Sequence, residues 1–250
     1  MTSFPIFTTH GISHGATSPT HLSLLDFQEF LQRSRAVHAS FLALKKQHFH
    51  SDLNENASNI KRFITFDDGL ESVLEAAAQM PFPGTVFVVS GHVGKYNDWL
   101  GQPQWVMRER CMGWPHLKEL IGMGWSVGAH THSHADLSQL NPLEIHNEIE
   151  FSQKQIEDRL GVPCEFFAYP YGHAPAIARQ IVNHLGLIGL GTVPGWVGPK
   201  SHLNHLPRIE IYDLLKCNSA AAMLFRQPTG SELNWLQFRR LGGSLLRHLA

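Results

Sequence analysis

Apolar and polar positions along the chain follow two alternating patterns. Short runs rich in β-branched and aromatic residues are separated by longer amphipathic stretches, which is typical of a parallel sheet covered by helices. The runs are apolar almost throughout, as expected for strands that are buried on both faces. Six runs are predicted as strands: residues 62–66, 85–89, 125–129, 165–170, 187–192 and 206–212. The pattern indicates an α/β fold, but it does not decide between a barrel and an open sheet.

Helical periodicity is clearest over residues 141–161. This stretch begins with an asparagine that can cap a helix and a proline, has Glu144 at the third helical position, and can end at Gly161. Two further helices are expected, one at residues 22–48 and one at residues 233–250. For the C-terminal helix we favour packing on the core over a position at a membrane surface.

The length of 250 residues suits a single domain. We predict one domain over residues 1–250, with a core at about 60–212, a helical N-terminal extension at 1–59 and a helical C-terminal segment at 213–250. The N-terminus resembles no signal peptide, and no apolar run approaches the roughly 20 residues of a membrane span. We therefore expect a cytoplasmic protein without a transmembrane segment, and leave a peripheral position at the membrane open.

The composition excludes several classes of function and directs attention to histidine. The net charge is −1, so there is no basic field for nucleic acid. The three cysteines are far apart and form no CxxC pair, so neither a disulfide framework nor a cysteine zinc site is indicated. Histidine stands out with 17 scattered residues, and its positions therefore need inspection.

Three histidines, His130, His132 and His134, follow the predicted strand at 125–129. In an extended chain His130 and His134 would lie about 13 Å apart, too far to share a metal ion. Residues four apart face the same way on a helical turn. The chain must therefore curl after His130 for this pair to converge, and His132 then points elsewhere. In a chain so rich in histidine the pair alone is weak evidence, because a polar surface turn gives the same pattern.

Two adjacent carboxylates, Asp67 and Asp68, follow the predicted strand at 62–66 and precede a glycine. Consecutive side chains of a strand point in different directions, so one carboxylate can bind a metal while the other takes a proton from water. An Asp-Gly turn is the ordinary alternative. Because the two carboxylates occur together with a histidine pair at another strand end, we favour a metal site over an ordinary turn.

The combined motifs resemble those of the polysaccharide deacetylase family, also called the NodB homology domain or carbohydrate esterase family 4. The resemblance covers about residues 60–212 and rests on TFDDG at 65–69, HTHSH at 130–134 and FAYPYG at 167–172. It implies a distorted (β/α) barrel that removes acetyl groups from N-acetylated or O-acetylated sugars with the help of a metal ion.

The same resemblance implies roles for single residues. Asp67 would be the catalytic base, and Asp68, His130 and His134 the metal ligands. Tyr171 takes the position whose backbone N–H helps to hold the oxyanion. We expect one divalent metal ion, with Zn²⁺ favoured and Fe²⁺ or Co²⁺ as alternatives, because a carboxylate ligand makes the site harder.

Three features of the family have no plain match. An arginine usually begins the third motif and orients the catalytic aspartate, but Ala168 stands there. Arg208, at the start of the last predicted strand, is a candidate replacement, and a surface salt bridge is the equally weighted alternative. The family's Asp-Trp pair is not evident, although Trp196 is a candidate for the pocket wall. The histidine that serves as general acid has no clear match, and His202 and His205 are the nearest candidates.

The stretch 91–115 lacks clear periodicity and is long for a connection. It carries Tyr96, Trp99, Trp105 and Trp114. It is either a self-packed surface loop or a rim that offers flat aromatic faces to a sugar. On the second interpretation, Trp99 joins Trp196 as a candidate substrate contact.

These features together predict a metal-dependent hydrolase of non-peptide C–N bonds. Its expected partner is an acetylated sugar, a glycan or a lipid-linked saccharide. Two alternatives stay open: a sugar-binding barrel that has lost activity, which the missing arginine favours, and a related hydrolase of a small amide. Metal content and turnover of an acetylated sugar separate these possibilities.

Overall fold

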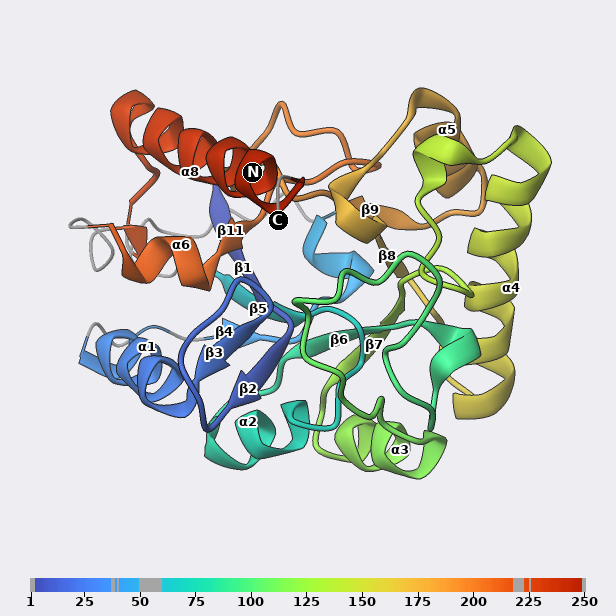
Figure 1. Ribbon diagram of the computed structural model, residues 1–250, viewed down its shortest axis with the longest axis horizontal. Helices are drawn as coiled ribbons and strands as arrows, with labels where there is room; N and C mark the ends of the chain where they lie inside the picture. The colour runs from blue at the N-terminus through green and yellow to red at the C-terminus, as the bar shows by residue number, and fades with distance from the viewer. Residues whose placement is uncertain are drawn as a thin grey trace.

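A curled sheet surrounded by helices forms the centre of the protein (Figure 1). The computed structural model describes residues 3–36, 39, 41–49, 60–217, 223–224 and 226–248. The strands of the main sheet are β1 (Phe4–Thr9), β4 (Phe41–Leu42), β5 (Arg62–Phe66), β6 (Thr85–Val88), β7 (Ser126–Ala129), β8 (Phe166–Ala168), β9 (Ile188–Leu190), β10 (Trp196–Val197) and β11 (Ile209–Glu210). Their order is β10-β1-β5-β6-β7-β8-β9, with β11 beside β1 and β4 beside β5. The pairs are parallel except for β1 with β10.

Helices and short turns connect these strands. The α-helices are α1 (Leu24–Ala36), α2 (Val73–Gln79), α3 (Trp114–Gly122), α4 (Pro142–Leu160), α5 (Ala176–His184), α6 (Ile211–Leu215) and α8 (Gly230–His248). The 3-10 turns are η1 (Lys46–Phe49), η2 (Ser90–His92), η3 (Leu137–Gln139) and η4 (Pro170–Gly172). A separate parallel pair consists of β2 (Gly11–Ser13) and β3 (His21–Ser23). No helix in the described part of the chain combines the length and the apolar character that crossing a membrane requires.

The capping signals predicted for α4 are confirmed. Asn141 Oδ1 accepts hydrogen bonds from the backbone N–H groups of Leu143 and Glu144, each at 3.0 Å. Glu144 Oε2 accepts from the backbone N–H of Asn141 at 2.8 Å, which completes the capping box. Gly161 ends the helix with φ 70°, a left-handed conformation that suits glycine.

Residues 206–210 join the two edges of the curled sheet. Leu206 donates its N–H to the carbonyl of Gly189 in β9, and its carbonyl accepts from the N–H of Gly191, both at 2.8 Å. Ile209 then pairs with Phe7 of β1. The sheet is thereby bridged from β9 to β1, in agreement with the barrel that the family resemblance implies.

The strand β1 differs from the prediction of a purely helical segment before residue 60. All six of its residues are buried, and it pairs in parallel with β5 from Ile6–Phe63 to Thr9–Phe66. The sheet therefore begins at residue 4, so the expected core boundary at 60 is wrong. Pro5 hides this strand in the sequence, because proline cannot donate to a ladder. In the structure Pro5 precedes the first residue that pairs with β5, so its missing N–H costs nothing there.

The other strands agree with the prediction to within about two residues, with one exception. Of the predicted strand at 206–212, only Ile209–Glu210 is a strand, because α6 begins at Ile211. Ile211 and Leu214 are both buried, and their spacing of three residues places them on one helical face. The helix expected at 22–48 is also shorter than predicted and ends at Ala36.

Both faces of the sheet are buried, as the continuous apolar runs predict. An inner cluster fills the barrel and includes Phe4, Phe63, Phe87 and Phe166. An outer cluster packs the opposite faces of the strands against the helices. The carboxyl ends of the parallel strands gather at one rim, which is where a barrel of this kind places its chemistry.

Candidate metal centre and active site

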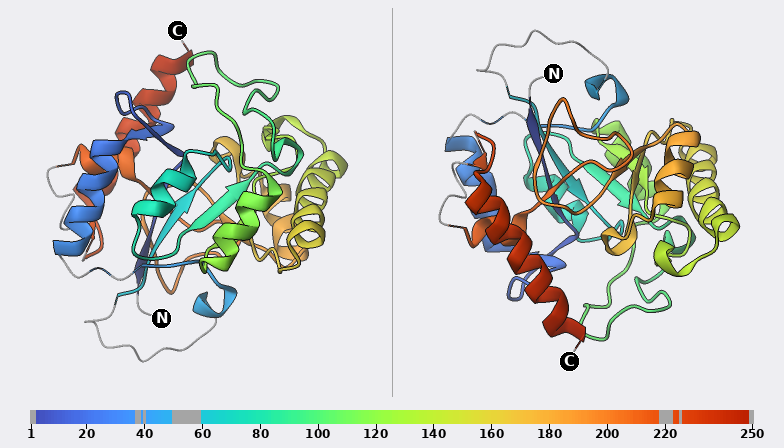
Figure 2. Two further views of the ribbon diagram at one scale, coloured as in Figure 1. Left: turned by 90° about the horizontal axis from the view of Figure 1, so that it is seen from below. Right: turned by 90° about the horizontal axis from the view of Figure 1, so that it is seen from above.

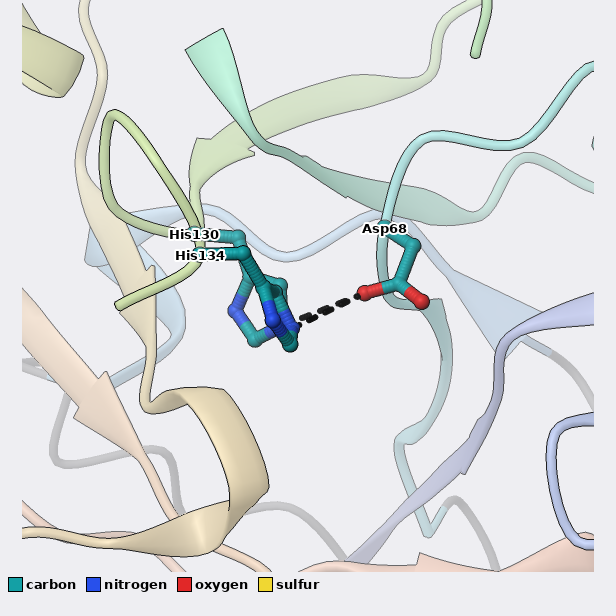
Figure 3. A group of neighbouring side chains, drawn as sticks. All are labelled: Asp68, His130 and His134. Atoms are coloured by element: carbon teal, nitrogen blue, oxygen red, sulfur yellow. Dashed lines mark ion pairs between the residues drawn. The ribbon is translucent and has the colours of Figure 1, made fainter. Parts of the chain in front are cut away.

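Asp68, His130 and His134 converge at this rim, as Figure 3 shows. Asp68 follows β5, and the two histidines follow β7. Asp68 Oδ1 lies 3.5 Å from His130 Nε2 and 3.3 Å from His134 Nε2. Two ligand atoms of a tetrahedral zinc site lie about 3.4 Å apart when each is about 2.0–2.1 Å from the ion. The three side chains are buried and therefore have the spacing and the chemistry of a metal site.

The hydrogen bonds of His130 support a cation at this position. His130 Nδ1 lies 2.8 Å from the carbonyl oxygen of Ala168, which can only accept, so Nδ1 carries the proton. In the neutral ring, Nε2 then presents a lone pair to Asp68. Asp68 Oδ1 makes no hydrogen bond within the described residues. Two electron-rich atoms thus face each other, and a divalent cation between them fits this donor set.

The pKa shifts reflect the same negative field. Burial opposes ionisation of Asp68, but the imidazoles of His130 and His134 beside it outweigh this and hold the pKa of Asp68 well below its usual value. Burial also disfavours the charged form of His130, yet Asp68 and Asp67 raise the pKa of this histidine above its usual value. A cation is therefore electrostatically favoured between these groups.

The turn after β7 curls as the histidine spacing requires. Thr131 and His134 have positive φ angles of 63° and 60°, which non-glycine residues rarely adopt. Glu148 of α4 holds the turn, because its Oε2 accepts from the N–H of His132 at 2.9 Å and from the next N–H along the chain at 2.8 Å. The side chain of His132 is turned away from the other two histidines, with Nδ1 3.0 Å from Ser90 Oγ, as predicted.

Asp67 is held by Arg208, whose guanidinium is fully buried. Arg208 Nη1 donates to Asp67 Oδ1 at 2.7 Å and Nη2 donates to Oδ2 at 2.8 Å. The remaining donors reach Gly191 O at 2.8 Å, Thr8 Oγ1 at 3.0 Å and Thr65 Oγ1 at 3.2 Å. The alternative of a surface salt bridge is therefore wrong. Burial raises the pKa of Asp67, but the charge of Arg208 outweighs this, and the net pKa lies below the usual value.

A cavity of about 750 Å³ opens above these groups. Asp67, Asp68, His130, His134 and Tyr171 all line it. Asp68, Thr131, His134 and Tyr171 are the non-glycine residues with positive φ in the described parts of the chain. Such backbone strain is characteristic of functional sites, since it persists only where surrounding contacts enforce it.

The residues and their order also match known proteins. Residues 54–189, more than half of the chain, match the family model for polysaccharide deacetylase. The chain belongs to the polysaccharide deacetylase family. It is an enzyme of this class, in agreement with the sequence prediction.

Individual relatives are distant. This deacetylase is 25% identical over 210 residues to the poly-β-1,6-N-acetyl-D-glucosamine N-deacetylase of Staphylococcus aureus strain MRSA252, which covers 77% of this chain and 68% of that protein. The structure of the Streptococcus pyogenes deacetylase PplD in complex with acetate superposes with a TM-score of 0.69 and 22% identity, covering 84% of this chain and 92% of that one. The structure of IcaB from Ammonifex degensii superposes with a TM-score of 0.66 and 20% identity, covering 89% of this chain and 98% of that one. These two structures establish the fold.

His10 of this deacetylase also belongs to the site, although none of the sequence motifs includes it. His10 follows β1 and lines the cavity, whereas neither His202 nor His205 lines it. Its Nδ1 is buried and makes no hydrogen bond within the described residues. Burial lowers the pKa of His10, against the opposing effect of Asp68 and Asp67. A signal was present, because an apolar run that ends in a histidine and a glycine repeats the pattern of the Asp67–Asp68 motif.

Trp99 and Tyr171 contact the metal ligand His134. The Trp99 ring stacks on the His134 ring with centroids 4.2 Å apart, and only 4% of Trp99 is exposed. The Tyr171 hydroxyl lies 3.1 Å from His134 Nδ1. We expected Trp99 to offer a flat face to a sugar at the rim. It does not, because its ring is buried against His134.

Trp196 does not line the cavity either. It pairs with Pro5 near the amino end of β1, whereas the catalytic rim lies beyond Thr9 at the opposite end. At the rise of about 3.3 Å per residue of a strand, four residues separate the two by roughly 13 Å. The interpretation of Trp196 as a wall of this cavity is therefore wrong.

Proposed function

We propose that this deacetylase hydrolyses the N-acetyl groups of a polymer of N-acetylated hexosamine. The observation that carries the proposal is the triad of Asp68, His130 and His134 beside Asp67, whose carboxylate is fixed by Arg208. The name of the Staphylococcus aureus relative, a poly-β-1,6-N-acetyl-D-glucosamine N-deacetylase, supports this substrate class. The cytoplasmic location stays a prediction.

Asp68, His130 and His134 would hold one divalent ion, and we propose Zn²⁺. Two imidazoles and one carboxylate are a ligand set that zinc accepts, and Fe²⁺ or Co²⁺ share it. When bound, the ion polarises a carbonyl and lowers the pKa of water. The carbonyl of Ala168 and the hydroxyl of Tyr171 orient the two histidine rings from behind.

Asp67 is the general base in this proposal. Both of its oxygens accept from Arg208, and each keeps a second lone pair that can take the proton of the attacking water. The low pKa of Asp67 keeps it ionised at neutral pH. The backbone N–H of Tyr171, in the strained turn beside the cavity, would donate to the oxyanion.

His10 is the general acid in this proposal: burial lowers its pKa, and the charges of Asp68 and Asp67 act in the opposite direction and favour the protonated ring that an acid needs. It lines the same cavity as Asp67 but comes from a different strand, so base and acid can act on different sides of the substrate amide. The proton on His10 would go to the amide nitrogen as its bond to the acetyl carbon breaks, so that acetate is released and the amine stays on the sugar.

The alternative of a barrel that has lost activity rested on the absent third-motif arginine. Arg208 occupies the place beside Asp67 that such an arginine would serve. The donor set for the metal is also complete within the cavity. These contacts favour an active enzyme over a pure sugar-binding protein.

Release of acetate tests the function. Purified protein with Zn²⁺ is offered N-acetylglucosamine oligomers, O-acetylated sugars and small acetamides, with and without a chelator. We expect acetate from the oligomers, loss of activity on chelation and recovery with added metal. Turnover confined to small amides, or none with any metal, contradicts the proposal.

Two pairs of variants assign the roles. Asp67→Asn should abolish turnover and keep the metal, whereas Asp68→Asn should lose both. His10→Gln should lower kcat by about 10²–10⁴-fold, the usual share of a general acid, with metal content unchanged. His202→Gln is its matched control and should behave as the unaltered enzyme. Equal activity of both histidine variants removes His10 from the mechanism.

A further inference from the structure

The cavity extends well beyond the catalytic groups. Its volume of about 750 Å³ lies in the upper part of the range of roughly 300–1,000 Å³ that ligand pockets occupy. The reacting acetamide needs only the floor, which His10, Asp67, Asp68, His130 and His134 form. Two parts of the wall come from segments without catalytic residues: α6 with α8, and residues 100–106.

The first wall consists of Tyr212 and Asp213 of α6 and Arg239 of α8. Arg239 Nε donates to Asp213 Oδ1 at 3.0 Å, which fixes the guanidinium. The same guanidinium lies 5.1 Å from the ring centroid of Trp235 and 5.9 Å from that of Tyr212. Arginine carries five N–H donors, and within the described residues only Nε of Arg239 is engaged, by Asp213. The wall thus presents a fixed planar donor group beside an aromatic ring.

The second wall is the tip of an arm, defined as residues 93–111. Its base is fixed, because Tyr96 bridges to Arg110 and Asn97 Oδ1 accepts from the N–H of Glu109 at 2.7 Å. Trp105 at the tip lines the cavity and is 43% exposed. In both views of Figure 2, the C-terminal half of α8 approaches this arm. The two walls therefore lie near each other at the mouth of the cavity.

We propose that Arg239, Tyr212 and Trp105 form a subsite for a neighbouring sugar unit, so that the enzyme acts on an oligosaccharide in preference to a monosaccharide. This inference rests on the proposed deacetylation of a hexosamine polymer. The acetamide of one unit reaches the floor, while the next unit lies between the arm and α8.

The chemistry of the wall suits a neutral sugar. A pyranose ring has an apolar C–H face, which packs on aromatic rings such as that of Trp105, with the half-buried Tyr212 beside it. Its hydroxyl and acetamide oxygens accept hydrogen bonds from the remaining Arg239 donors, and bonds to a charged donor are the stronger kind. Because Asp213 holds Arg239 in place, little side-chain entropy is lost on binding.

The test compares chain lengths. The value of kcat/KM is measured on N-acetylglucosamine and on its β-1,6-linked pentamer, and the ratio of pentamer to monomer is the readout. The unaltered enzyme should favour the pentamer by at least tenfold. Arg239→Ala should reduce this ratio by about tenfold, the factor that corresponds to loss of one hydrogen bond to a charged group. Trp105→Ala should also reduce it, because the packing of the sugar face on the indole ring is lost. Phe238→Ala is the matched control, since Phe238 adjoins Arg239 on α8, is 75% exposed and does not line the cavity.

The outcomes separate this inference from the proposed function. If neither sugar is deacetylated, the proposed function fails. If both are deacetylated with the same kcat/KM, or if Arg239→Ala lowers both values equally along with the melting temperature, the subsite is overturned, because Arg239 then only holds α8. Binding of the pentamer to Asp67→Asn, measured by calorimetry with and without Arg239→Ala, gives a second readout, and equal affinities also overturn the subsite.

Discussion

At the scale of single residues, the site depends on side chains that hold other side chains. Arg208 binds both oxygens of Asp67, and the two residues are 141 positions apart. Ala168 lacks the side chain that the third motif usually supplies, yet its carbonyl fixes the proton on His130 Nδ1. The orienting groups of this site therefore come from more distant parts of the chain than the motifs alone indicate.

Replacement of Arg208 should change the pH dependence of the enzyme. With the guanidinium present, the pKa of Asp67 lies below its usual value, so the base stays ionised as the pH falls. In Arg208→Ala, burial dominates and raises this pKa, so the acidic limb of the kcat/KM profile should move to higher pH. Arg208→Lys keeps the charge and should shift the limb less, with metal content unchanged in both. A profile of Arg208→Ala that overlays the unaltered one contradicts this role.

The same variant should also lose stability at neutral pH. An unpaired buried carboxylate costs about 3–5 kcal/mol. Because the folded-state pKa of Asp67 is depressed, its stabilising contribution is present above the unfolded-state pKa and is lost as the pH falls through the folded-state value. Urea unfolding of Arg208→Ala should therefore show a large deficit at pH 7 that shrinks in acid.

Trp99 should contribute to metal affinity although it cannot bind metal. Its ring stacks on His134, and this contact limits the orientations of the ligand. Loss of a group that orients a metal ligand typically weakens binding by about 10–100-fold. We expect Trp99→Leu to weaken Zn²⁺ binding within this range and Trp99→Phe to weaken it less, measured by competition with a chromogenic chelator. If the dissociation constant of Trp99→Leu for Zn²⁺ equals that of the unaltered enzyme, stacking on His134 has no effect on metal affinity.

At the scale of elements, the turn after β7 depends on α4. The strained residues Thr131 and His134 need an outside partner, and Glu148 provides it through backbone hydrogen bonds. Ser133 Oγ adds a third bond to Glu148 at 2.8 Å. The well-capped helix α4 is thus the support on which the histidine pair rests.

Loss of Glu148 should loosen this turn. Glu148→Ala leaves N–H groups of the turn without their acceptor, and we expect it to lower the free energy of unfolding by about 1–3 kcal/mol and to weaken metal binding. Glu150→Ala on the same helix removes only surface pairs with Lys154 and His146, and a surface pair is worth about 0–1 kcal/mol. Urea unfolding and a zinc titration measure both effects. If Glu150→Ala matches Glu148→Ala, the turn does not need this support.

At the scale of the whole molecule, the site combines residues that come before and after the segment that matches the family model. His10 comes from the strand β1, while Arg208 comes from the segment that joins β9 to β1. The family match at residues 54–189 contains neither residue. The N-terminal segment is therefore part of the barrel and of the active site.

Deletion of residues 1–10 should abolish the fold. It removes a strand whose six residues are all buried between β5 and the pair β10 and β11. We expect no cooperative thermal transition by circular dichroism, because the inner cluster loses Phe4 and Ile6 and the sheet opens. Deletion of residues 1 and 2 alone is the control and should melt as the intact chain. A normal transition in the longer deletion would show that β1 is dispensable.

The sequence by itself determined the local features. The caps of α4, most strand positions, and the Asp67–Asp68 and His130–His134 groups at strand ends follow from periodicity and from preferences that act over a few residues. Only the tertiary structure decided that Arg208 meets Asp67, that β1 joins β5, that His10 enters the cavity and that Trp99 lies flat on His134. These contacts join residues that are from 35 to 141 positions apart. They depend on which strands become neighbours when the sheet curls, and no local preference encodes that order.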